Sequence, residues 1–231
     1  MICWSCEKDA GAAALCAACG APQPVSTHGV RADHFAVLGV ERRYDLDGAA
    51  LEARYKELSR KLHPDRFAKA DPRARRAALQ RTVQLNEAWR ALKDPLERAE
   101  YLLEQGGVKI ATDDGGARAG GVAASPALLM EILELREELG DARAAKDDAK
   151  VARLGAAMRA RAAAATARVA AGLTGAASAA ALEGVARELV ALRYYQRFLD
   201  EVVAHEEAKD EEAKDHAAKD QDANDEAAAH G

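Results

Sequence analysis

The sequence predicts an all-α protein made of a helical hairpin, a C-terminal three-helix bundle and a small N-terminal metal-binding knuckle. Apolar residues recur at steps of three and four over long stretches, which is the period of amphipathic helices. The chain has 231 residues, is rich in alanine and has only 4% aromatic residues, so thin helical cores are expected. Four cysteines in two Cys-x-x-Cys pairs occupy its beginning. This length allows one or two domains.

The first segment, residues 1–24, is predicted to bind one structural zinc ion. Two Cys-x-x-Cys pairs can present four thiolates to one tetrahedral ion, and Gly20 relieves the tight backbone after the second pair. Zinc suits a closed, redox-silent sulfur site, and so short a segment needs the metal in order to fold. An iron site and two redox-active dithiols are the alternatives; disulfides are not expected without a secretory signal. The expected ligands are Cys3, Cys6, Cys16 and Cys19.

A helical hairpin is predicted to follow a short linker at 25–31. Residues 33–39 form a short apolar helix that a glycine ends. In residues 48–62, leucine and tyrosine recur at helical spacing behind an aspartate that can cap the helix. Pro64 ends this helix, because it disfavours helical geometry at His63 and has no backbone N–H.

The second arm of the hairpin starts with another capping signal. Asp71 is a candidate cap and Pro72 stands at the first helical position. One face of this helix carries an apolar stripe in which Trp89 is expected to be part of the core. Asp94-Pro95 repeats the start signal for a last short helix that two glycines end.

The tip of the hairpin resembles the J domain, by which co-chaperones stimulate ATP hydrolysis in DnaK-class chaperones. A His-Pro-Asp tripeptide alone is a weak signal, but here it joins two helices of suitable length within residues 32–105. The resemblance implies that Asp65 engages an arginine of the chaperone's ATPase domain and that the basic face of helix 48–62 docks on an acidic surface. A solvated face of mixed charge is the alternative for that helix. The implied chaperone-binding residues are His63, Pro64, Asp65, Arg54, Lys56, Arg60 and Lys61.

A Gly-rich linker at 106–124 is predicted to precede a bundle of three antiparallel helices at 125–206. The first helix starts at a Ser-Pro pair and shows two adjacent apolar stripes, so it must bury both or offer one to a partner. The second helix is predicted to end at a turn bracketed by Gly172 and Gly175. The core stripe of the first helix holds Leu128, Ile132, Leu135 and Leu139, and that of the third holds Leu182, Val185, Leu189, Leu192, Leu199 and Val203.

Two stretches narrow the resemblance to HscB-type co-chaperones of iron–sulfur cluster assembly. They are Asn-Glu-Ala-Trp followed by Asp-Pro-Leu-Glu-Arg-Ala within residues 86–103, and Leu-Met-Glu-Ile-Leu-Glu-Leu-Arg-Glu-Glu-Leu at 129–139. In that family the first bundle helix, with an aromatic residue of the last one, binds the cluster scaffold protein, IscU. The alternative is that the apolar strip only packs against the hairpin or the linker. The implied scaffold-binding residues are Leu129, Met130, Leu133, Glu134, Glu137 and Tyr194, where many relatives have phenylalanine at the last position.

The resemblance implies a non-enzymatic adaptor. It would stimulate the ATPase of a DnaK-class (HscA-like) chaperone and deliver an IscU-like scaffold protein to it, which promotes cluster transfer. It would carry zinc and no iron–sulfur cluster of its own. A general J-domain co-chaperone with another client is an alternative. A zinc-ribbon nucleic-acid-binding protein is disfavoured, because residues 1–24 hold one lysine and no arginine to neutralise phosphates.

Charge is unevenly distributed along the chain. Of the formal net charge of −5, residues 206–231 contribute −7, with ten acidic residues and three lysines, so the remainder carries +2 and gives no general case for nucleic-acid binding. Residues 207–231 form a charged low-complexity tail whose five-residue repeat cannot make an apolar stripe; a frayed helix extension or disorder is expected. Its His216 and His230 are too sparse to indicate a metal. With no secretory signal and no membrane span expected, we predict a cytoplasmic protein.

Overall fold

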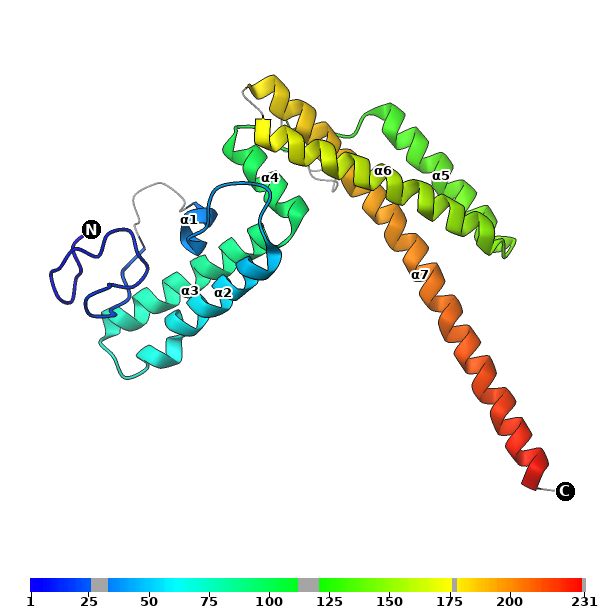
Figure 1. Cartoon of the computed structure of the whole chain (residues 1–231), viewed down its shortest axis with the longest axis horizontal. Coiled ribbons are helices and arrows are strands. Elements are labelled where there is room, and N and C mark those ends of the chain that lie inside the picture. The colour runs from blue at the N-terminus through cyan, green and yellow to red at the C-terminus, as the bar shows by residue number, and fades with distance from the viewer. Residues whose placement is uncertain (26–32, 112–120, 176–177, 230–231) are drawn as a thin grey trace. The chain divides into compact units, whose positions relative to one another are not determined.

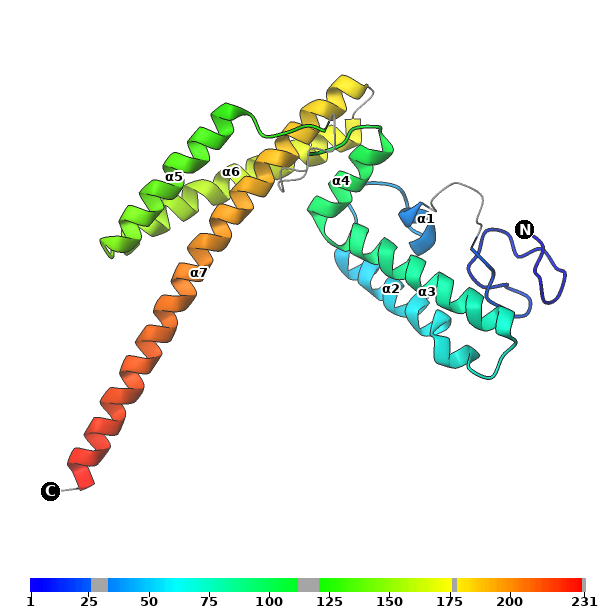
Figure 2. The same ribbon diagram turned by 180° about the vertical axis from the view of Figure 1, so that it is seen from behind.

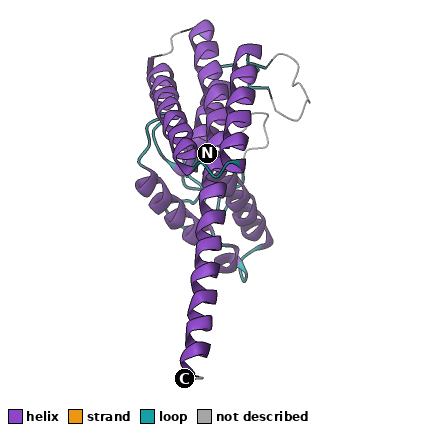
Figure 3. Ribbon diagram, turned by 90° about the vertical axis from the view of Figure 1, so that its right-hand side faces the viewer, coloured by secondary structure: helices purple, strands orange, loops and turns teal. Residues whose placement is uncertain are grey.

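The computed structural model describes residues 1–25, 33–111, 121–175 and 178–229, with the side chains of the last helix described up to Glu211 and at Lys214. The regular elements of these described residues are all helices, which confirms the predicted all-α class (Figure 3). The chain divides into two compact units, one mainly Met1–Gly107 and the other mainly Val108–Gly231. Within the described ranges, none of the helices combines the length and apolarity needed to cross a membrane.

The first unit contains the predicted hairpin. Its elements are α1 (His34–Leu38), α2 (Gly48–Leu62), a 3₁₀ turn (Pro64–Phe67), α3 (Pro72–Lys93) and α4 (Pro95–Gln105). Figure 1 shows α2 and α3 lying side by side, with the 3₁₀ turn at the end that joins them. Aspartate side chains cap all four α-helices by accepting hydrogen bonds from first-turn amides, as the sequence predicts for α2, α3 and α4. The caps are Asp33, Asp47, Asp71 and Asp94.

The core of the hairpin forms where α1, α2 and α3 meet. Its buried residues are contributed by all three helices, and Trp89 packs against them from a partly buried position. The indole of Trp89 also stacks on Tyr55, with ring centroids 4.7 Å apart. The expected core role of Trp89 is therefore confirmed, although its ring lies at the core's edge. The fully enclosed members are Phe35, Leu38, Leu51, Leu62, Leu85, Ala88 and Leu92.

The second unit is built from α5 (Pro126–Ala144), α6 (Asp148–Gly175) and α7 (Ala179–Ala229). Figure 2 shows α5 and α6 along the first half of α7, which extends well beyond them. The buried side chains of this core include Ile132, Leu139, Val151, Met158, Phe198 and Val202. Ion pairs connect the helices as well: Arg161 of α6 with Glu131 at 2.7 Å and Arg136 of α5 with Glu201 at 2.7 Å.

Two details of the bundle differ from the sequence prediction. Gly172 does not bracket a turn, because α6 continues to Gly175. A β-carbon at Gly172 would collide with the side chain of Val185, so this glycine lets α6 and α7 approach closely. On α7, Val203 is exposed while Phe198 and Val202 are buried. Other members of the predicted stripe agree with the structure, since Val185, Leu189 and Leu192 are buried and Leu199 packs against the core. At the end of the stripe, the core takes the large ring of Phe198 together with Val202, and Val203 faces away from it.

The two ends of the glycine-rich connection are in contact with each other. Ile110 pairs with Val122 in an isolated bridge, and the backbone N–H of Ala111 donates to the carbonyl of Val122 at 2.9 Å. Gly121 permits this contact, because a β-carbon there would lie 2.7 Å from the backbone nitrogen of Ala111. The central glycines of the predicted linker, most of the predicted 25–31 linker and His230 lie outside the described residues, as does the side chain of His216.

The charged tail is helical as far as Ala229, as a continuation of α7. Lys209 forms an ion pair with Asp148 at the start of α6, so contacts of the bundle extend past residue 206. The neighbouring lysine lowers the pKa of Asp148. No buried residue of α7 follows Val202 among the side chains that are described, in keeping with a repeat that cannot form an apolar stripe.

Candidate functional site

The His-Pro-Asp tripeptide stands exposed where α2 ends. Pro64 stops the helix at Leu62, and His63 adopts φ −53° and ψ 128°, outside the helical region. The backbone N–H of Asp65 donates to Nδ1 of His63 at 3.3 Å, which fixes the imidazole over the turn. The side chains of His63 and Asp65 are 55% and 88% exposed. Both are therefore accessible to another protein.

The basic residues of α2 differ in how far their side chains are engaged. Arg54 donates from Nε to the carbonyl of Leu38 at 3.1 Å, which ties α2 to the end of α1. Arg54 and Lys61 both pair with Glu57, at 2.7 and 2.6 Å, and the hydrogen bonds from Lys61 and Arg54 lower the pKa of Glu57 to about 2. Lys56 pairs with Glu52 at 2.6 Å, and Arg60 is exposed. All four cations lie on the helix that leads to His63.

The two stripes of α5 have opposite surroundings. Ile132 and Leu139 are buried, and Leu128 and Leu135 pack against the same core. On the other side, Leu129, Met130 and Leu133 are 43%, 56% and 50% exposed. Positions 129, 133 and 137 are four residues apart, as are 130 and 134, so they share one helix face. The structure therefore brings together five of the six expected scaffold-binding residues on one exposed strip, the α5 strip: Leu129, Met130, Leu133, Glu134 and Glu137.

Tyr194, the sixth expected scaffold-binding residue, has a different environment. Its ring is partly buried and packs against the core of the bundle. The guanidinium of Arg197 lies over that ring, 5.8 Å from its centroid. Tyr194 thus has a structural role in α7, and any contact with a partner would use only the exposed part of its ring.

The four cysteines form one compact cluster. Their Sγ atoms all lie within 4.8 Å of one another, with Cys3 and Cys16 buried and Cys19 exposed. Two similar loops create it: the backbone N–H of Glu7 donates to the carbonyl of Cys3 at 3.0 Å, and that of Gly20 donates to the carbonyl of Cys16 at 2.8 Å. Both loops turn through positive φ, 62° at Glu7 and 73° at Gly20. Only the second loop has the glycine that this conformation favours.

The chemistry of the cluster fits a metal ion. Burial alone would raise the pKa of the Cys3 thiol, but the amides of Ser5 and Cys6 and the side chains of Cys19 and Gln23 lower it to about 6. The amide of Lys8 acts in the same direction on Cys6, yet the crowded sulfurs of Cys19, Cys3 and Cys16, together with burial, raise its pKa to about 12. Four thiolates this close repel one another, so full ionisation requires a cation between them.

The sequence did not predict several contacts that hold the knuckle together and attach it to α3. Gln23 is fully buried and donates from Nε2 to Sγ of Cys3 at 3.3 Å. Arg81 of α3 donates to the carbonyls of Gln23 and Pro24, at 2.8 and 3.1 Å, and so holds the knuckle against the hairpin. Arg73 lies over the ring of Trp4 at 5.1 Å. Arg81 looks like an ordinary surface residue in the sequence, because its partners are backbone atoms nearly sixty residues away.

The comparisons with known proteins agree on one family. The family model described as "DnaJ domain" matches residues 33–101, and the one described as "HSCB C-terminal oligomerisation domain" matches residues 124–203. The chain therefore carries both a DnaJ domain and the C-terminal domain of the HscB family. A curated relative, "Co-chaperone protein HscB homolog" of Bordetella petrii, is 44% identical over 119 residues, which span 52% of this chain and 65% of the relative.

Solved HscB structures have the same architecture. "Chaperone HscB from Vibrio cholerae" aligns with a TM-score of 0.64 and 29% identity, and covers 77% of this chain and 99% of its own. Human co-chaperone protein HscB aligns with a TM-score of 0.69 and 23% identity, and covers 88% of this chain and 98% of its own. Because the identity is 23%, the similarity to the human protein supports a shared fold alone.

Proposed function

We propose that this protein is a co-chaperone of the HscB type that stimulates the ATPase of a DnaK-class, HscA-like chaperone and delivers an IscU-like scaffold protein to it. The observation that carries the proposal is the exposed His63-Pro64-Asp65 turn at the end of a basic helix. Hydrolysis in the partner would hold the chaperone on the scaffold and promote transfer of the iron–sulfur cluster. The catalytic groups then belong to the partner, and this chain acts without being an enzyme.

In this mechanism the turn works by position and charge. Asp65 carries a carboxylate on an exposed loop, where it can pair with an arginine of the ATPase domain. His63, whose Nδ1 accepts the amide hydrogen of Asp65, orients that carboxylate and transfers no proton. The cations Arg54, Lys56, Arg60 and Lys61 would steer the helix toward an acidic surface of the chaperone.

The α5 strip is proposed as the scaffold-binding surface. Three exposed apolar side chains beside two carboxylates suit a partner surface that presents apolar and basic groups. Its position on a helix whose opposite face is locked into a core keeps these side chains in register. Tyr194 would add to this surface only through the exposed edge of its ring.

The cysteine cluster is proposed to hold one structural zinc ion through Cys3, Cys6, Cys16 and Cys19. Zinc supplies closed tetrahedral coordination without redox chemistry, and four cysteine ligands would fill its four positions. An iron ion in the same site is the competing occupant. We expect no iron–sulfur cluster bound by this chain itself.

A general J-domain co-chaperone with a different client remains the second candidate function, because the turn and α2 serve any client equally well. The favouring observation for the scaffold is the α5 strip, which lies outside the DnaJ-domain match. Nucleic-acid binding by the knuckle is the weakest candidate, since Lys8 is its only lysine.

The test is the steady-state ATPase of the purified DnaK-class chaperone, measured with and without this protein and the scaffold. Stimulation by the wild-type protein should be lost in His63→Gln, because the turn can no longer hold Asp65, while helicity by circular dichroism stays unchanged. Stimulation that the scaffold does not increase would favour the general J protein. Equal stimulation by wild type and His63→Gln would contradict the proposal.

A further inference from the structure

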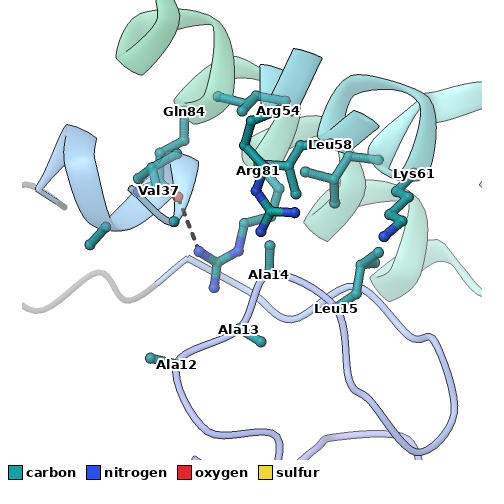
Figure 4. Close-up of a pocket in the computed structure, with 14 residues that line it drawn as sticks. Ala12, Ala13, Ala14, Leu15, Val37, Arg54, Leu58, Lys61, Arg81 and Gln84 are labelled. Atoms are coloured by element: carbon teal, nitrogen blue, oxygen red, sulfur yellow. Dashed lines mark hydrogen bonds between the residues drawn. The ribbon is translucent and has the colours of Figure 1, made fainter. Parts of the chain in front are cut away.

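A cavity of about 410 Å³ lies within the first unit, between the metal knuckle and the helical hairpin. Residues 12–15 of the knuckle form one wall, and α1, α2 and α3 form the others (Figure 4). Ligand-binding pockets have volumes of about 300 to 1,000 Å³, so this cavity can hold one or two side chains of a peptide. We call it the knuckle groove. Nothing in the proposed roles of the turn or of the cysteine cluster uses it.

The wall from the knuckle is held in place by direct contacts. The two carbonyls that Arg81 binds, those of Gln23 and Pro24, fix the knuckle on α3, and its Nη1 donates to Oε1 of Gln84 at 3.1 Å. Ala14 and Leu15 pack against the same core as α1 and α3. The groove is therefore formed before any partner arrives, which lowers the cost of binding.

The groove is apolar inside and positively charged around it. Leu15 and Leu58 contribute apolar surface, while Arg54, Lys61 and Arg81 are the charged residues of its lining, which contains no acidic residue. Glu57 lies just outside and is shared by Arg54 and Lys61, so one cationic charge of that trio stays unmatched. Among the residues that the structure describes, the hydrogen-bond partners of the Arg81 guanidinium are neutral carbonyl and amide oxygens. An occupant with both a carboxylate and an aliphatic side chain would match this lining.

We propose that the knuckle groove receives an acidic segment of the DnaK-class ATPase partner that also carries an aliphatic side chain, so that the metal knuckle forms part of the chaperone-docking surface. The inference rests on the proposed function. Its support is continuity: Arg54 and Lys61 line the groove and also belong to the basic face of α2, and Lys61 is two residues from His63. A segment docked beside α2 would extend the contact from the turn to the knuckle.

The experiment places charge on the knuckle wall without touching α2 or the turn. Ala13 is exposed and lines the groove, whereas Ala18 is exposed on the same knuckle and does not line it. Chaperone ATPase is measured against the concentration of full-length Ala13→Glu, Ala13→Lys, Ala18→Glu and wild-type protein, at low and high salt. Metal content and tryptophan fluorescence check that each variant is folded.

Ala13→Glu should raise the half-maximal concentration roughly three- to tenfold at low salt, and less at high salt, because its carboxylate competes with the occupant's. Ala13→Lys should equal or tighten wild-type affinity, and Ala18→Glu should match wild type. The maximal stimulation should be unchanged in all of them, since the turn is intact.

The failures of the two proposals are distinguishable. No stimulation by wild-type protein would sink the proposed function itself. Normal stimulation with the same half-maximal concentration for Ala13→Glu and Ala18→Glu would overturn the groove proposal alone. Equal weakening by Ala13→Glu and Ala13→Lys would reject an acidic occupant, and weakened scaffold binding by Ala13→Glu with unchanged chaperone affinity would reject the ATPase partner as the occupant.

Discussion

Arg98 is a charged residue placed almost entirely inside the protein, with 5% of its surface exposed. Its guanidinium donates to the carbonyls of Leu92 and Tyr44, both at 2.8 Å, and to that of Lys93 at 3.5 Å. Leu92 and Lys93 are in the last turn of α3, whose carbonyls have no helical partner. A single side chain of α4 thus caps α3 and fastens the loop that holds Tyr44.

Arg98→Met should destabilise the first unit by about 1–3 kcal/mol, because it keeps the aliphatic volume but removes the charged donor from the buried carbonyl of Leu92. The carbonyl of Tyr44 loses one donor and keeps the backbone N–H of Leu46. Arg90→Met is the matched control: Arg90 is exposed on α3, so its replacement should cost within about 0.5 kcal/mol. Urea unfolding followed by tryptophan fluorescence measures both, since Trp4 and Trp89 lie in this unit. Identical midpoints for the two variants would show that Arg98 is no cap.

At the scale of elements, local chemistry determined most helix boundaries. Each of α3, α4 and α5 begins with a capping side chain followed by proline, and these starts are legible in the sequence because both signals act within a few residues. The places of Val203 on α7 and of Gly172 on α6 were wrong for the opposite reason. Both depend on which side chain of a neighbouring helix comes close, and the spacing of apolar residues along one helix does not contain that information.

The α5 strip gives the prediction at this scale. Met130→Ala together with Leu133→Ala should weaken binding of the purified scaffold protein about tenfold or more, because truncation removes central apolar contacts. Stability should hardly change, since both side chains are exposed. Calorimetry measures the affinity, and circular dichroism measures the helix content.

Leu79→Ala with Val83→Ala is a closely matched control for the strip. These two side chains are 56% and 50% exposed on α3, the same fractions as Met130 and Leu133 on α5. The control should bind the scaffold as wild type does. An equal loss of scaffold affinity in both double variants would mean that the scaffold binds through general surface hydrophobicity and not through the α5 strip. A change in oligomeric state confined to the α5 variant would instead identify the strip as a contact between copies of this chain.

On the scale of the whole molecule, the chain carries three separate features on which the proposed function rests: the exposed turn, the α5 strip and the cysteine knuckle. The sequence predicted all three, since each is a compact motif. It did not predict the knuckle groove, or the roles of Gln23 and Arg81, because these arise only when the knuckle rests on α3. Contacts between segments sixty residues apart leave no periodic trace in a single sequence.

The knuckle has a core of three buried residues, Cys3, Ala10 and Cys16, which is too little apolar surface to offset the entropy of ordering 24 residues. Its fold must therefore come from the metal, whereas all the buried residues of the core of α1, α2 and α3 belong to those helices. Removing the metal with a chelator under reducing conditions should unfold the knuckle and leave the helices intact.

Metal analysis of the purified protein should then give one zinc ion per chain, and hydrogen exchange should be slow at the amides of Cys3, Cys16 and Gln23 only while zinc is bound. These amides donate to carbonyls of the knuckle itself, those of Lys8, Ala21 and Ala14, at 2.8 to 2.9 Å, so they exchange quickly once the loops open. Circular dichroism should hardly change. Because Arg81 holds Gln23 and Pro24, the loss should also loosen the knuckle from α3 and remove one wall of the groove. Slow exchange at these amides in metal-free, fully reduced protein would show that the knuckle folds without an ion.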